Sequence, residues 1–160
     1  MIVTVVVWFL KKGSGIIIDR ISQDYGLRIN QKMELYRICL EAIQVVPREV
    51  FRAFDMLIEV SPRENGGGDS EGSPRVLISG VWAQLTLAQS KTDEIAAIIE
   101  CAVLAEIASR ALGGIRSQLV NITERKTTLI LTDIAIERAK ESFDAEFAEE
   151  ADKCLGKVRV

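Results

Sequence analysis

The chain has 160 residues, of which 48% are hydrophobic and 27% charged; its formal net charge is −3, and it contains no histidine. This profile is typical of one globular domain or two small ones, long enough to bury a core without disulfide or metal crosslinks. The missing histidine excludes Ser-His-Asp and Cys-His catalysis, histidine-ligated metals and imidazole pH switches within this chain.

The acidity is concentrated near the C-terminus. The sequence is close to neutral through residue 92, and acidic residues gather between Glu137 and Asp152. This balance argues against coating nucleic acid by bulk charge, because neutralising phosphates requires a clustered excess of Lys and Arg. Any anionic partner would therefore have to meet a local basic patch.

The three cysteines, Cys39, Cys101 and Cys154, are far apart in sequence and form no C-x-x-C pair. Such spacing indicates reduced thiols and gives no zinc motif. We therefore expect an intracellular protein and leave its compartment open.

The apolar run at residues 2–10 (IVTVVVWFL) has nine residues, whereas a membrane-spanning helix requires about 20. Lys11 and Lys12 follow the run instead of preceding it, which does not fit a secretory signal. We expect residues 1–12 to form an extended arm with strand character, and we expect no membrane partner.

A first helical unit is predicted over residues 14–60, after a hinge at residues 13–15. It contains a short helix at residues 16–25, an extended segment at residues 27–29, and a long helix that Asn30 caps and that runs to about Val60. An apolar stripe marks this helix, and Pro47 should kink or divide it. The stripe comprises Leu35, Ile38, Cys39, Ala42, Ile43, Val46, Val50, Phe51, Phe54 and Leu57.

Residues 61–74 (SPRENGGGDSEGSP) have the composition of a flexible linker or loop, and residues 75–160 form a second predicted unit. Residues 75–79 (RVLIS) favour a short strand, and residues 80–89 are compatible with helix or strand. Ser90 or Thr92 is expected to cap the strongest predicted helix, at residues 95–120, which Gly113 and Gly114 could break.

The C-terminal region begins with a polar turn at Arg125 and Lys126, followed by a predicted strand at residues 129–131. Thr132 or Asp133 is expected to cap a last amphipathic helix that runs to about Leu155. The whole pattern predicts a mainly α fold, with long central helices and short strand-like loops. A helical bundle with an N-terminal strand is the alternative.

No residue set in the sequence points to a catalytic, cofactor or metal site. The three glycines at residues 66–68 lie in an acidic loop without the Lys-Ser/Thr of a phosphate-binding loop. Glu100 and Glu106 are six residues apart, which places them on different helix faces. We therefore predict a protein that is not an enzyme.

Basic residues recur beside the short extended segments. Residues 17–42 (IIDRISQDYGLRINQKMELYRICLEA) resemble the first helix, first loop and central helix of histones. Residues 125–143 (RKTTLILTDIAIERAKESF) resemble the second loop and last helix of the same family, and residues 75–89 resemble a weaker copy of that element. The chain is thus similar to a single or tandem histone-fold unit.

The resemblance implies binding to the backbone of double-stranded DNA through the basic loops, independent of base sequence and sensitive to salt. The residues that it assigns to this contact are Arg28, Arg75, Arg125, Lys126 and Thr127. It also implies association with a protein partner or with a second copy through the apolar helices. The alternative function is a structural or assembly subunit of a larger complex, without nucleic acid.

Overall fold

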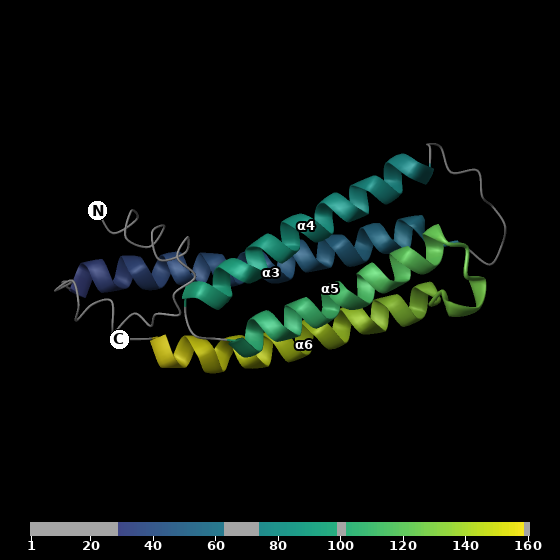
Figure 1. Cartoon of the computed structure of the whole chain (residues 1–160). Coiled ribbons are helices and arrows are strands. Elements are labelled where there is room, and N and C mark those ends of the chain that lie inside the picture. The colour runs from purple at the N-terminus through teal and green to yellow at the C-terminus, as the bar shows by residue number, and fades with distance from the viewer. Residues whose placement is uncertain (1–28, 63–73, 99–101, 159–160) are drawn as a thin grey trace.

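The computed structural model describes residues 29–62, 74–98 and 102–158. Within them the chain forms four α-helices and a short 3-10 helix, and it contains no strand. The helices are α3 (Ile29–Val60), α4 (Pro74–Ile98), α5 (Ala102–Thr123) and α6 (Asp133–Val158), and the 3-10 helix η1 is Thr127–Leu129. Consecutive helices run antiparallel and lie side by side as a bundle (Figure 1). The predicted mainly α fold is confirmed.

Several predictions fall outside the described residues. These are the N-terminal arm at residues 1–12, the short helix at residues 16–25 and most of the linker at residues 61–74. Ile29, which we expected to be extended, is the first residue of α3, so the long helix begins one residue before its predicted cap, Asn30.

One apolar core runs along the bundle and takes side chains from all four helices, on both sides of residues 61–74. α3 and α5 each pack against the other three helices. Burying a Leu, Ile or Val side chain contributes roughly 1.5–3 kcal/mol, so these residues dominate the stability of the bundle. The largest fully buried side chains include Leu57, Leu85, Ile95, Leu104, Leu112, Ile115, Leu119 and Ile136.

Pro47 does not divide the long helix, contrary to one of our two expectations for it, because α3 is continuous from Ile29 to Val60. An internal proline costs about 3 kcal/mol, since it removes one helical hydrogen bond and crowds the preceding turn. Ile43, Val46 and Val50 are all buried around it. Their burial outweighs the penalty, at roughly 1.5–3 kcal/mol for each side chain.

A buried polar contact fixes α4 against α3. Nε2 of Gln84 donates to the backbone oxygen of Glu49 at 2.9 Å and to Oε2 of the same residue at 2.7 Å. Both residues are buried, and a buried carboxylate is costly unless it accepts hydrogen bonds. Sliding α4 along α3 would break both bonds, so this pair sets the register of the two helices.

The predicted strand at residues 75–79 is wrong, because these residues form the first turns of α4. A five-residue apolar run does not distinguish strand from helix by periodicity alone, and packing against α3 decides the outcome. The predicted helix cap at Ser90 or Thr92 is also wrong. Both lie inside α4, where the buried Thr92 hydroxyl donates to the Ala88 carbonyl at 2.8 Å.

The single helix predicted for residues 95–120 is instead two antiparallel helices, since α4 ends at Ile98 and α5 begins at Ala102 (Figure 1). The sequence around this point carries no Gly or Pro that would mark a helix end. The two glycines that do occur, Gly113 and Gly114, lie within an unbroken α5.

The start of α6 confirms its predicted cap. Oγ1 of Thr132 accepts the backbone N–H of Ala135 at 3.2 Å, and Asp133 is the first residue of the helix. The strand predicted for residues 129–131 is wrong. Residues 127–129 form η1 and Ile130 is extended, and no other strand in the described part of the chain is there to pair with it.

Candidate functional site

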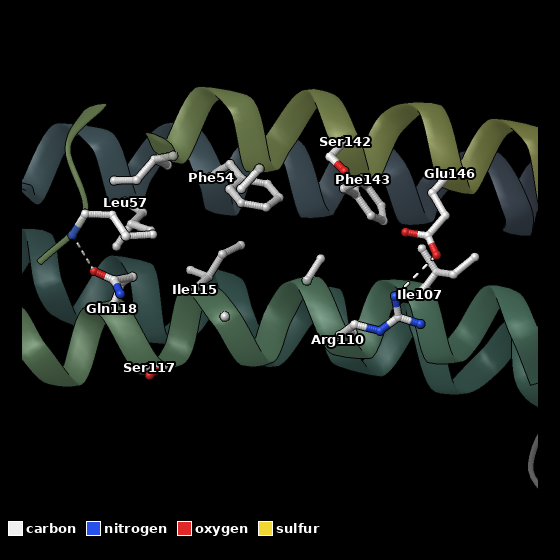
Figure 2. Close-up of a pocket in the computed structure, with 15 residues that line it drawn as sticks. Phe54, Leu57, Ile107, Arg110, Ile115, Ser117, Gln118, Ser142, Phe143 and Glu146 are labelled. Carbon is white, nitrogen blue, oxygen red and sulfur yellow. Dashed lines mark hydrogen bonds and ion pairs between the residues drawn. The ribbon is translucent and has the colours of Figure 1, made fainter. Parts of the chain in front are cut away.

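A groove of about 400 Å³ lies between α5 and α6, with α3 beneath it (Figure 2). Its floor consists of apolar side chains from these three helices, and its rim carries a few polar ones. The floor is formed by Phe54, Leu57, Ile107, Ile115, Ile136 and Phe143.

Small residues keep the groove open. Ala111, Gly114 and Ser117 recur every three residues along α5, which places them on one face of the helix. On the opposite wall α6 presents Ala139 and Ser142. A Cβ atom added at Gly114 would have no neighbour within 4 Å, so α5 and α6 leave real space between them at this height.

An aromatic cluster anchors α6 to α3 beneath the groove. The Phe143 ring lies 5.8 Å from that of Phe51 in an edge-to-face arrangement. It also lies 6.4 Å from Phe54 and 5.4 Å from Phe147, between ring centres. Aromatic pairs at these distances add about 0.5–1.5 kcal/mol beyond the burial of their area. The floor of the groove is therefore part of the core.

A charged contact also holds α6 against α3. Nζ of Lys140 lies 2.7 Å from Oδ1 of Asp55 on α3 and 5.6 Å from the centre of the Phe51 ring. The hydrogen bond to Asp55 raises the pKa of Lys140 above its ordinary value, against a smaller opposing effect of desolvation. The Lys140 ammonium thus links α6 to α3 at any pH at which it is protonated.

At each end of the groove the polar side chains already have partners within the chain. At one end Arg110 of α5 pairs with Glu146 of α6 at 3.2 Å. At the other end Oε1 of Gln118 accepts the backbone N–H of Leu131 at 2.8 Å, as the dashed lines in Figure 2 indicate. The arrangement therefore favours burial of uncharged apolar surface over proton transfer or anion binding.

Three large apolar side chains on or beside the connection between α5 and α6 are exposed. Leu129, Leu131 and Ile134 are 54%, 43% and 67% exposed, and Leu131 also lines the groove. Hydrogen bonds from Asn121 to the Leu129 carbonyl and from Leu131 to Gln118 fix this connection to α5. We call Leu129, Leu131 and Ile134 the apolar turn.

Arg125, a predicted DNA-contacting residue, ends α5 in a left-handed conformation with φ of 59°. The N–H of Arg125 donates to the Ile122 carbonyl, and that of Lys126 donates to the Asn121 carbonyl. This pair of bonds is the Schellman arrangement, in which glycine usually occupies the left-handed position. The arginine side chain is exposed.

The other predicted DNA-contacting residues lie in different settings. Lys126 is exposed and pairs with Glu124 at 2.7 Å, and Thr127 is the exposed first residue of η1. Arg75 is the second residue of α4, whose beginning lies at the same end of the bundle as the connection between α5 and α6 (Figure 1). Arg28 lies outside the described residues.

Sequence analysis missed the groove and the apolar turn. The small residues on α5 and α6 become a feature only when the two helices are known to be antiparallel and adjacent. Their spacing of three on each helix was the available signal. The apolar turn was missed because residues 129–131 were predicted to form a strand, and a strand would pack Leu129 and Leu131 in a sheet.

No group of three or more Cys, Asp or Glu residues in the described part of the chain is placed to hold a metal ion. None of the described helices combines the length and the apolar character needed to cross a membrane.

Comparison with protein families, with curated proteins and with solved structures gives no match. The resemblance to the histone fold therefore stays a prediction from the sequence.

Proposed function

We propose that this chain is a non-enzymatic assembly subunit, and that its groove between α5 and α6 binds an apolar segment of another polypeptide. The observation that carries this proposal is the open, apolar groove of about 400 Å³, whose lining includes the exposed Leu131 of the apolar turn. Contiguous exposed apolar surface of this kind marks interaction sites in folded proteins.

The extent of this surface favours a polypeptide over a small molecule. A groove of this volume alone would fit a small ligand. However, the groove follows α5 from Ile107 to Gln118, which is roughly 17 Å at about 1.5 Å per helical residue and longer than a compact ligand. A helix or extended segment laid between α5 and α6 would fill this whole length.

Two adjacent glycines provide the test and its control. Gly114 lines the groove, Gly113 does not, and a Cβ atom added at either one meets nothing within 4 Å. The native mass of the chain is measured in extracts of its host by size-exclusion chromatography with light scattering. We expect an assembly heavier than the 17.7 kDa monomer, which Gly114→Trp disrupts and Gly113→Trp leaves intact. A native chain that migrates as a monomer would refute the proposal.

DNA binding through a histone-like surface is the second candidate function. The supporting observation is that Arg125 is exposed and that the α4 end carrying Arg75 lies at the same end of the bundle. The ion pair between Lys126 and Glu124 weakens this candidate, because a neighbouring carboxylate repels phosphate.

Its test is the binding of the purified chain to duplex DNA at low salt. We expect affinity to fall steeply as salt rises, and Arg125→Gly combined with Lys126→Ala to weaken binding for all sequences alike. Glycine suits the left-handed position of Arg125, so this variant removes charge without disturbing the end of α5. If the native chain does not bind, DNA binding is excluded as its function.

A further inference from the structure

We propose that residues 2–10 of the same chain occupy the groove between α5 and α6 when no partner is bound. The proposal rests on the groove being a site for an apolar polypeptide segment, as proposed above. It adds a built-in competitor, so that a partner must displace this segment to bind.

The chemistry of the groove selects an uncharged occupant. Arg110 and Glu146 pair with each other at one end, and Gln118 is engaged with the backbone of Leu131 at the other. Between these ends the floor is apolar, so a charged side chain laid there would lose its water without gaining a partner. Residues 2–10 (IVTVVVWFL) contain no charged side chain and only one polar one.

The dimensions of the groove and the segment agree. From Ile107 to Gln118 the groove follows α5 for roughly 17 Å, at about 1.5 Å per helical residue. Nine residues span roughly 14 Å as a helix or roughly 30 Å when extended. A helical segment would thus fill the groove, and an extended one would also cover the apolar turn.

The connection to α3 is long enough for the segment to return to its own groove. Phe54 lies roughly 38 Å along α3 from Ile29, at about 1.5 Å per residue. Residues 11–28 can span up to about 60 Å, at roughly 3.3 Å per residue. Tethering at such lengths gives an effective concentration on the order of a millimolar, well above that of a second copy at micromolar concentration. The segment of the same chain is therefore the favoured occupant.

Trp8 reports on this contact directly. The chain has two tryptophans, so Trp82→Phe leaves Trp8 as the only one in an otherwise unaltered chain. We expect its emission to be shifted to the blue and protected from acrylamide quenching. Gly114→Leu, which fills the groove, should shift the emission to the red and remove the protection, whereas Gly113→Leu should change neither. Emission typical of a fully hydrated indole before any groove substitution would overturn the proposal.

A second measurement leaves Trp82 in place, in case its replacement disturbs folding. p-Benzoylphenylalanine introduced at Ser142 in the groove is expected to crosslink to residues 2–10 within one chain, identified by mass spectrometry. Crosslinks to other segments, or products of twice the monomer mass, would overturn occupancy by the same chain. Neither result touches the proposed assembly function, which is measured by the native mass of the complex in extracts.

Discussion

Replacing Gly113 and Gly114 with alanine should stabilise the bundle. Both residues lie inside α5, where glycine is less favourable than alanine by roughly 0.5–1 kcal/mol because it loses more backbone freedom on folding. Within the described bundle an added Cβ atom meets nothing within 4 Å at either position, so the bundle itself imposes no steric cost. Gly113→Ala should therefore raise the free energy of unfolding by that amount, and the melting temperature by roughly 2–4 °C per kcal/mol. Gly114→Ala should gain less, because the segment that we propose to occupy the groove lies against this position.

Urea unfolding followed by circular dichroism at 222 nm measures the change, with an unaltered slope required for the comparison. Gly80→Ala serves as a contrast, because its added Cβ would lie 3.3 Å from the Met56 methyl group and should gain less. Loss of stability in Gly113→Ala would refute the reasoning. A smaller gain at Gly114 than at Gly113 would indicate that something already fills the groove beside Gly114.

Three further predictions concern single contacts. Arg125→Gly should stabilise the protein by about 0.5–1 kcal/mol in urea unfolding, because glycine adopts the left-handed conformation without strain. Gln84→Leu should destabilise it by roughly 1.5–3 kcal/mol in the same assay, because the buried carboxylate of Glu49 loses its donor. Stability should decline as the pH rises through the raised pKa of Lys140, above its ordinary value of 10.5, because its ion pair with Asp55 is complete only at lower pH.

Each of these predictions has a matched control. Arg125→Ala should bring no gain, since alanine is strained in the same conformation, and a gain equal to that of glycine would contradict the explanation. Replacing Glu49 and Gln84 together by Leu should cost less than Gln84→Leu alone, because no buried carboxylate remains and Arg48, which pairs with Glu49, is exposed to water. Asp55→Asn should remove the contribution of Lys140 to the alkaline loss of stability. An identical alkaline profile for this variant would exclude the ion pair as its cause.

The parts of the fold that sequence analysis predicted correctly are those with a local signal. The last helix begins at its predicted cap, since Thr132 satisfies a free N–H group that every helix start must satisfy. The apolar stripe on α3 is buried or partly buried where its side chains are described, with Val46, Val50 and Leu57 at most 1% exposed. Periodicity over about six turns leaves little ambiguity about which face is inside.

The errors occur where the outcome depends on distant parts of the chain. Residues 75–79 are apolar and partly β-branched, yet α3 offers them a helix face and no described strand offers them a sheet. The sequence between α4 and α5 has no Gly or Pro, so only the packing of two antiparallel helices on α3 reveals that they are separate. The groove is a property of the pair α5 and α6, and neither helix alone encodes it.

The glycines of α4 and α5 differ in what their packing requires. At Gly80 an added Cβ would approach Met56 to 3.3 Å, so the absence of a side chain there allows α4 to lie close to α3. At Gly114 nothing within the described bundle uses the space, although glycine inside a helix costs roughly 0.5–1 kcal/mol relative to alanine. Helix packing therefore accounts for Gly80 and leaves Gly113 and Gly114 unexplained, and of these two only Gly114 lines the groove. An occupant of the groove, lying against the bare backbone at Gly114, would supply the missing contact. For this reason we place the binding function in the groove between α5 and α6.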